Sequence, residues 1–147
     1  SDMPMLGASL SGLKALVEKW NPSNLVSLST SQVMSQYIKA ETSKTKLSWC
    51  EQEASGGSVS TAQWFVSHAW MYAFLDVVSA LSRHFAGSDP VLWFDVVSVS
   101  QHQSHERTYD WWNSAFLNAV GQMGRVVMVL DSWDRPLTLQ RAWCIFE

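Results

Sequence analysis

An indole and a carboxylate stand at helical spacing near the end of the chain. Trp143 and Glu147 are four residues apart, so on a helix both side chains would lie on one face. A carboxylate beside an aromatic wall is desolvated, which raises its pKa and suits acid–base or electrostatic roles toward a ligand stacked on the ring. The spacing alone favours the competing interpretation, in which Trp143, Cys144 and Phe146 are core residues and Glu147 is solvated.

Polar side chains also follow three apolar runs in the second half of the chain. Loops at residues 67–70, 98–109 and 131–136 each come after a stretch that we predict to be a buried strand. In open α/β sheets, ligands bind beyond the carboxyl ends of the strands. These three loops are therefore the predicted place of a binding site.

The elements that would position these loops follow from the apolar periodicity. We predict strands at residues 64–66, 91–97 and 126–130, and helices at 74–85, at 110–123 and from about 138 onward. Alternating strands and helices predict an α/β fold with right-handed crossovers and a parallel sheet. Three such strands leave a sheet edge open. Residues beyond 147, the first 58 residues or another subunit would have to cover it.

The first 58 residues are predicted to form a helical extension. Ser11 is the candidate N-cap of a helix that ends before Asn21, and Thr30 or Ser31 is the candidate N-cap of a second helix. Residues 55–58, Ser-Gly-Gly-Ser, are the best linker candidate. We therefore divide the chain into an N-terminal extension, residues 1–58, and an α/β domain, residues 59–147.

Composition excludes several classes of protein. The 147 residues, 47% hydrophobic and 16% charged, suit one domain with one core and argue against disorder. The net charge of −3 argues against nucleic acid as a partner. The longest apolar run has seven residues, too few to span a membrane. Two cysteines indicate a reducing, cytoplasmic compartment rather than a disulfide scaffold.

Motifs for the common phosphate cradles and for α/β-hydrolases are absent from the sequence. It contains no G-x-G-x-x-G, G-x-x-x-x-G-K or G-x-S-x-G. A bound nucleotide would thus be held by side chains, stacking and helix N-termini. The spacing of His102, His105 and Glu106 matches no zinc motif, so we predict a flexible polar loop and no metal.

Motifs on the predicted strands resemble the Toll/interleukin-1 receptor (TIR) domain superfamily. Residues 65–69, Phe-Val-Ser-His-Ala, are similar to the first strand and loop of bacterial TIR domains, and residues 126–130 to their third strand. Trp143 and Glu147 match the W-x-x-x-E spacing of TIR-type NAD-cleaving enzymes.

The middle of the chain resembles the fungal HET domain, a relative of TIR domains. Residues 93–95, Trp-Phe-Asp, with 98–101, Ser-Val-Ser-Gln, follow the W-I-D-x-x-C-I-[DN]-Q pattern. Residues 141–147 follow the R-G-W-x-x-Q-E ending of that family. Together the two resemblances cover roughly residues 62–147.

The resemblance implies a flavodoxin-like parallel sheet and an NAD+ glycohydrolase that self-association activates in immune or cell-death signalling. NAD+ would be the substrate, with no cofactor, and Glu147 the catalytic residue. A non-catalytic TIR-like adaptor that only self-associates is the alternative. The implied substrate-contacting residues are Ser67, His68, Ala69, Trp70, Asp95, Trp133 and Trp143. Asp95 has a second possible role in orienting the loop after it. The implied self-association loop contains Gln101, His102 and His105.

The chain departs from the two families at several positions. Ser98 and Ser100 replace the Cys and Asp/Asn of the HET pattern, and residues 68–70, His-Ala-Trp, stand where many TIR enzymes have an arginine. TIR domains continue beyond the helix that carries the glutamate, whereas this chain stops at Glu147. We therefore expect a domain that is truncated at its carboxyl end.

Overall fold

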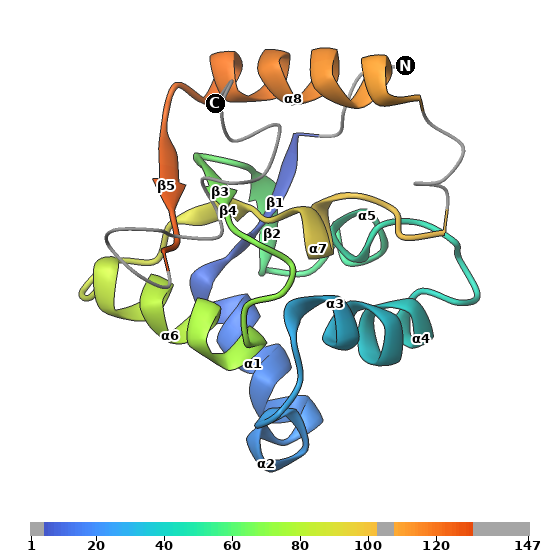
Figure 1. Cartoon of the computed structure of the whole chain (residues 1–147), viewed down its shortest axis with the longest axis vertical. Coiled ribbons are helices and arrows are strands. Elements are labelled where there is room, and N and C mark those ends of the chain that lie inside the picture. Colours follow the sequence, from blue (N-terminus) through green and yellow to red (C-terminus); the bar gives the residue numbers. More distant parts are fainter. Residues whose placement is uncertain (1–4, 103–107, 131–147) are drawn as a thin grey trace.

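The structure is an α/β protein whose helices cover a mixed five-stranded sheet (Figure 1). The computed structural model describes residues 5–102 and 108–130 of the chain. The strand order is β2-β1-β4-β3-β5. The strands are β1 (Leu6–Ser9), β2 (Val59–Thr61), β3 (Trp64–Ser67), β4 (Val91–Trp93) and β5 (Val126–Met128).

The three strands predicted in the second half of the chain form the parallel part of this sheet, with β5 at its edge among the described strands. β3 pairs with β4 on one side and with β5 on the other, so Phe65 stands opposite both Trp93 and Val126. The rings of Phe65 and Trp93 stack with centroids 5.0 Å apart. Successive residues of a strand face opposite sides, and accordingly Val66 and Leu92 belong to the core on the other face.

The N-terminal segment contributes β1 and, at its junction with the following part, β2. Both run antiparallel to their neighbours, so the expectation of a wholly parallel sheet is wrong. β1 covers the edge at β4, which confirms one of the alternatives for the open edge. Gly7 permits this close pairing, because a Cβ atom there would lie 2.4 Å from the carbonyl oxygen of Leu92. The hydrogen bonds of this ladder depend on partners far along the chain, which local periodicity does not report.

The two helices predicted in the first 58 residues and those predicted at 74–85 and 110–123 form, whereas the helix predicted from about residue 138 lies outside the described residues. The N-caps of the first two lie one or two residues earlier than expected. Ser9 caps the first helix in place of Ser11, and its Oγ atom accepts a hydrogen bond from the Gly12 amide. Gly124 ends the last described helix in the left-handed conformation, as glycine does at this position. The helices are α1 (Leu10–Trp20), α2 (Pro22–Leu25), α3 (Thr30–Val33), the π-helix η1 (Met34–Ile38), α4 (Lys39–Glu41), α5 (Trp49–Gln52), α6 (Phe74–His84), α7 (Asp95–Ser98) and α8 (Tyr109–Met123). Within the described ranges, no helix combines the length and apolar character needed to cross a bilayer.

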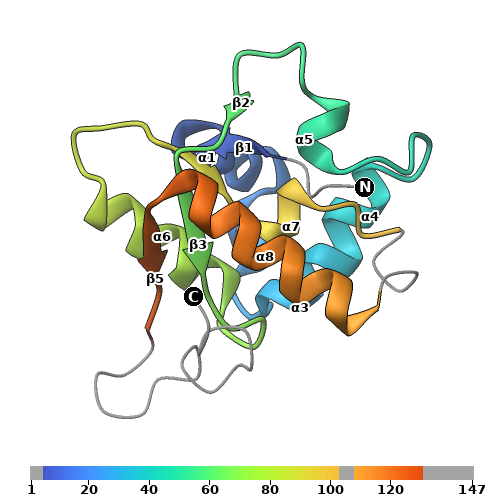
Figure 2. The same ribbon diagram turned by 90° about the horizontal axis from the view of Figure 1, so that it is seen from above.

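The sheet has a core on each face. Helices α1 and α6 lie on one side of it and α8 on the other (Figures 1 and 2). The larger core includes Leu13 of α1 and Leu81 of α6. The smaller core joins Phe116 of α8 to Phe65 and Trp93 of the central strands. α8 therefore covers the face toward which the two stacked aromatic side chains point.

The predicted second strand is shorter than expected. Val96 and Val97 were expected to continue it, but they belong to α7, a single helical turn that begins at Asp95. Both valines are buried, so their apolar character is satisfied without strand pairing. Because α7 begins two residues after the end of β4, Asp95 lies at the carboxyl end of that strand.

Candidate functional site

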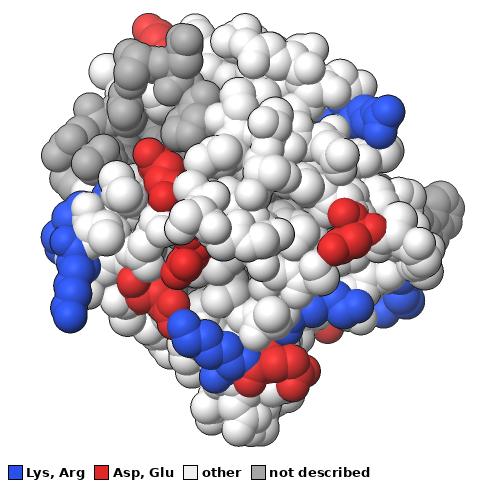
Figure 3. Space-filling model, turned by 180° about the vertical axis from the view of Figure 1, so that it is seen from behind, with Lys and Arg blue, Asp and Glu red and all other residues white. Residues whose placement is uncertain are grey.

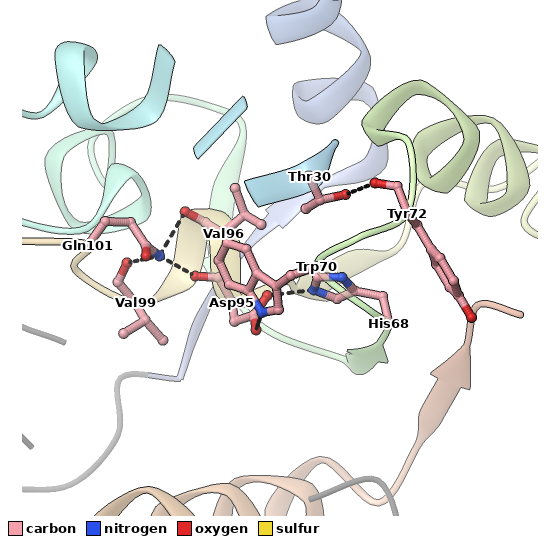
Figure 4. Close-up of polar contacts among 8 residues, drawn as sticks. All are labelled: Thr30, His68, Trp70, Tyr72, Asp95, Val96, Val99 and Gln101. Carbon is pink, nitrogen blue, oxygen red and sulfur yellow. Dashed lines mark hydrogen bonds and ion pairs between the residues drawn. The ribbon is translucent and has the colours of Figure 1, made fainter. Parts of the chain in front are cut away.

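A buried histidine and aspartate meet at the carboxyl ends of β3 and β4. His68 directly follows β3, and Asp95 is the second residue after β4. Because these strands are parallel neighbours, the two side chains reach the same edge of the sheet. The Nε2 atom of His68 lies 2.6 Å from Oδ1 of Asp95 (Figure 4). His68 is fully buried, whereas the side chain of Asp95 keeps 11% of its surface exposed.

The second oxygen of the same carboxylate accepts a hydrogen bond from Trp70. The indole Nε1–H of Trp70 donates to Oδ2 of Asp95 over 3.1 Å. The rings of His68 and Trp70 are 5.7 Å apart. Asp95 thus accepts hydrogen bonds from two residues of the loop after β3, and it joins this loop to the one after β4 (Figure 4).

The two ring nitrogens of His68 have different surroundings. The Nε2 atom contacts the Asp95 carboxylate, whereas the Nδ1 atom is buried and has no hydrogen-bond partner among the described residues. His68 therefore holds Asp95 through one ring nitrogen.

Gln101 fixes the turn that carries Asp95. Its side-chain Nε2 atom donates to the backbone carbonyl oxygens of Asp95, Val96 and Val99, at 3.0, 3.3 and 3.0 Å (Figure 4). The residue is buried. A short helix leaves most of its carbonyls without partners in the helix. The Gln101 amide satisfies those of Val96 and Val99 and shares that of Asp95 with the Val99 amide. Its role in this structure is to hold the backbone of α7.

The N-terminal segment supports the site from the other side. The backbone amide and the Oγ1 atom of Thr30 both donate to the carbonyl oxygen of Tyr72, and the Ser31 amide donates to that of Trp70. These bonds tie the start of α3 to the loop after β3 (Figure 4). The predicted extension is therefore part of the framework that positions Trp70.

A pocket of about 470 Å³ opens beside this cluster, between α3, η1 and the first half of α8. Its wall is mostly aromatic and apolar, with Asp95 at one side. The described lining residues are Ser31, Met34, Trp70, Asp95, Val99, Gln101, Tyr109, Trp112, Asn113 and Phe116. The volume falls in the range of ~300–1,000 Å³ that is typical of small-molecule sites.

The structure brings some of the predicted site residues together. Trp70 and Asp95 line the pocket, and His68 holds Asp95 from behind. Ser67 and Ala69 are buried beside His68. Glu147, Trp143 and Trp133 lie outside the described residues, as do His105 and the loop at residues 131–136.

The other described residue of the predicted self-association loop is His102, which lies against the N-terminal segment. Its Nε2 atom is 2.8 Å from Oγ1 of Thr42, whose hydroxyl donates to the Ile38 carbonyl. Desolvation, together with the charges of Lys46 and Lys39, lowers the pKa of His102. Because the Thr42 hydroxyl donates to Ile38, the His102 ring donates to Thr42. The lowered pKa favours the neutral form of the ring.

Sequence reasoning missed the walls of the pocket that come from α8 and the N-terminal segment. Trp112 and Phe116 have the spacing of core residues, and Ser31 and Met34 lie in the part interpreted as an extension. One signal was present: the aromatic residues Tyr109, Trp111 and Trp112 gather at the start of a helix, directly after a polar loop. The π-helix beside the pocket is a second indication, visible only in the structure, since such turns occur often at functional sites.

Cys50 is excluded as a nucleophile. Its thiol is buried 3.9 Å from the Ser98 hydroxyl, and burial raises its pKa to about 12. The thiolate required for nucleophilic attack is therefore scarce at neutral pH. Among the described residues, no group of three or more His, Cys, Asp or Glu side chains is placed to hold a metal ion.

Comparisons with protein-family models, with curated proteins and with solved structures find no match for this chain. The site is therefore interpreted from its own geometry and chemistry.

Proposed function

We propose that this chain is a TIR-type NAD+ glycohydrolase that self-association activates in immune or cell-death signalling. The observation that carries the proposal is the aromatic pocket at the carboxyl ends of β3 and β4, with Asp95 among its lining residues. Ligands bind at this edge in open α/β sheets. The order β4-β3-β5 of the parallel strands also agrees with the start of a flavodoxin-like sheet, in which the first strand lies between the second and the third.

The proposed reaction breaks the N-glycosidic bond between nicotinamide and ribose. The attached ring is cationic, so it takes the bonding electron pair and leaves as a neutral base without a general acid. Positive charge then develops on the ribose, and a nearby carboxylate stabilises it. We assign this role to Glu147, with Trp143 shaping the adjacent wall. Water adds to the ribose carbon and loses a proton, which gives ADP-ribose.

Several groups of the described site would support this reaction. Trp70 and Trp112 provide flat faces for the nicotinamide ring, and Asp95 provides a negative charge beside it. His68 is buried behind Asp95, so it positions this carboxylate and does not touch the substrate. Self-association through the loop containing Gln101, His102 and His105 would complete the pocket.

A non-catalytic self-association module is the second candidate. Large apolar side chains beside the site favour it: Met71 is 76% exposed and Tyr109 is 62% exposed. Exposed apolar surface at a rim is typical of contacts between proteins. The two candidates differ in one measurable property, the release of nicotinamide.

Partners and compartment are part of the same proposal. NAD+ or a related nucleotide and further copies of the chain are the proposed partners, in the cytoplasm. Acidic and basic side chains are interspersed on the face that Figure 3 shows, which does not favour the phosphate backbone of a nucleic acid. The thiol of Cys50 is free and buried, which agrees with a reducing compartment.

The test is incubation of the full chain with NAD+, both dilute and clustered on a solid support. We expect nicotinamide release that depends on clustering and that Glu147→Gln abolishes. Glu18→Gln, at an exposed position of α1, is the matched control and should keep the activity. Absence of release from the folded, clustered protein would refute the enzyme and favour the self-association module.

A further inference from the structure

We infer that Thr30 is a positioning residue of the pocket: it holds the loop after β3, residues 68–73, in the place where the Trp70 indole forms part of the pocket wall. Thr30 is not one of the described lining residues, so it acts through Trp70. The inference deepens the proposed function and rests on it for the ligand, because the nicotinamide ring would stack on Trp70. The mobility of the indole can be measured whether or not that function holds.

The first argument is the set of contacts between the start of α3 and the loop after β3. The Thr30 amide and the Thr30 Oγ1 atom both donate to the carbonyl oxygen of Tyr72, at 2.8 and 2.9 Å (Figure 4). The side chain of Thr30 is fully buried. Three further contacts flank this pair of bonds: the Ser31 amide to the Trp70 carbonyl at 3.1 Å, the antiparallel bridge of Ser29 with Ala73, and the Phe74 amide to the Leu28 carbonyl at 3.1 Å. Thr30 therefore lies in the middle of a short antiparallel contact.

The second argument is the availability of these donors. Thr30 and Ser31 belong to the first turn of α3, and the first amides of a helix have no acceptor within it. Ser29 and Gln32 form a capping box, which fixes the start of the helix. A rigid helix start thus offers two amides and one hydroxyl to the loop, and Thr30 supplies two of these three donors.

The third argument is the way in which Trp70 is held. Its backbone carbonyl accepts from the Ser31 amide, and its indole Nε1–H donates to Oδ2 of Asp95. The next residue, Met71, is 76% exposed, so the core does not hold the loop at this point. Loss of the Thr30 hydroxyl would therefore loosen the backbone from which the indole projects.

The pocket depends on this contact because both sides of it contribute to the wall. Ser31 and Met34 line the pocket together with Trp70. Stacking on the indole would act in the bound substrate and in the transition state alike, so its loss should raise KM and leave kcat nearly unchanged. A purely structural role would instead lower the folded fraction, which reduces the apparent kcat at constant KM.

The experiment uses variants of the full chain that isolate the Thr30 hydroxyl. Thr30→Val keeps the branched shape without the donor, and Thr30→Ser keeps the donor. Thr30→Ala is the second variant, because it adds no bulk and differs from Thr30→Ser only by the oxygen. Thr42→Val is the matched control, since Thr42 is also buried and its Oγ1 atom donates to the Ile38 carbonyl at 2.8 Å, within the N-terminal segment.

The first measurement is the exchange of the Trp70 indole N–H with water, followed by NMR. Its signal is the one that Trp70→Phe removes. We expect exchange about fivefold faster in Thr30→Val and Thr30→Ala, the effect of one lost hydrogen bond, and within about twofold of the wild type in Thr30→Ser and Thr42→Val. Urea unfolding should show similar losses of stability in Thr30→Val and Thr42→Val, so general loosening would not explain the difference.

The second measurement is nicotinamide release by the clustered protein as a function of NAD+ concentration. We expect Thr30→Val to raise KM by about fivefold with kcat within about twofold of the wild type, and Thr30→Ser to keep both values.

Each outcome decides the inference. Equal indole exchange in folded Thr30→Val and Thr30→Ser, equally fast exchange in Thr42→Val, or an unchanged KM in an active Thr30→Val would overturn it. Failure of both Thr30→Val and Thr30→Ala to fold would show a structural role only and would overturn it as well. Absence of nicotinamide release from the wild type would refute the glycohydrolase, and indole exchange alone would then decide whether Thr30 positions Trp70.

Discussion

The imidazole Nε2 of His68 and the carboxylate Oδ1 of Asp95 are 2.6 Å apart, and this contact joins the loops that follow two neighbouring parallel strands. The contact lies at the carboxyl edge of the sheet, where it also fixes the orientation of the Asp95 carboxylate. The pocket beside it therefore depends on a buried polar pair.

Asp95→Ala should be strongly destabilising. It would leave the fully buried His68 and the indole N–H of Trp70 without their acceptor, at an expected cost of about 2–4 kcal/mol in the free energy of unfolding. Urea unfolding measures this cost, with Asp89→Ala as an exposed control that should lose less. A double-mutant cycle with His68→Ala should give a coupling energy of about 1–3 kcal/mol. Strictly additive losses would contradict a coupled pair.

Gln101→Glu should cost more stability than the apolar Gln101→Met. The amide of Gln101 faces three carbonyl oxygens, so a carboxylate in its place would meet acceptors without a proton to offer. We expect a loss of about 1 kcal/mol for Met and about 3 kcal/mol for Glu at pH 7.5. The gap should narrow as the pH falls toward ~5, because the protonated acid can donate. Equal unfolding midpoints of the two variants in urea at pH 7.5 would count against this role.

Gly7→Ala tests whether the N-terminal strand belongs to the sheet. A Cβ atom at Gly7 would meet the Leu92 backbone at 2.4 Å, so the strands must separate, at an expected cost of about 1–3 kcal/mol. Gly57→Ala is the control, since nothing lies within 4 Å of its added Cβ, and it should change stability by less than about 0.5 kcal/mol. Urea midpoints compare the two variants. Similar midpoints would show that β1 does not pair with β4 in solution.

His102 should make stability decrease as the pH falls. In the folded protein, the pKa of His102 lies below its ordinary value of 6.5. Desolvation is the main cause, and the positive charges of Lys46 and Lys39 add to it. The unfolded chain therefore binds a proton at higher pH than the folded one. The stabilising contribution is complete above about pH 6.5 and is lost as the pH falls from there through the folded-state pKa. In His102→Gln, the melting temperature should decrease less between pH 7.5 and 5.5 than in the wild type, and an identical decrease would refute the assignment.

Some of the site could be inferred from the sequence because it depends on neighbours in the chain. The apolar run before His68 and the run before Asp95 predict two buried strands, and parallel pairing brings their carboxyl ends together. The patterns alone placed Asp95 inside the second strand, residues 91–97, so its inclusion among the site residues came from the family resemblance. The hydrogen bond between His68 and Asp95 could not be predicted from the apolar pattern. It depends on the helical turn α7, and the pattern predicted a strand at those residues.

The walls of the pocket could not be inferred in the same way. A tryptophan at helical spacing is interpreted as a core residue whether it packs against the sheet or lines a pocket. Trp112 does both, because it packs against the smaller core and also lines the pocket. Nor does a local pattern show that Ser31, far from β3 in the sequence, lies beside Trp70.

The sequence by itself determined the alternation of strands and helices from residue 64 to residue 128, the helix N-caps to within two residues and the position of the polar loop after β3. Each of these follows from side-chain periodicity and capping within a few residues, which are properties of short segments. Only the tertiary structure decided that β1 joins the sheet, that Gln101 points inward and that aromatic side chains enclose a cavity beside Asp95. These features depend on contacts between residues far apart in the chain, whose free energy is set by which groups are removed from water together.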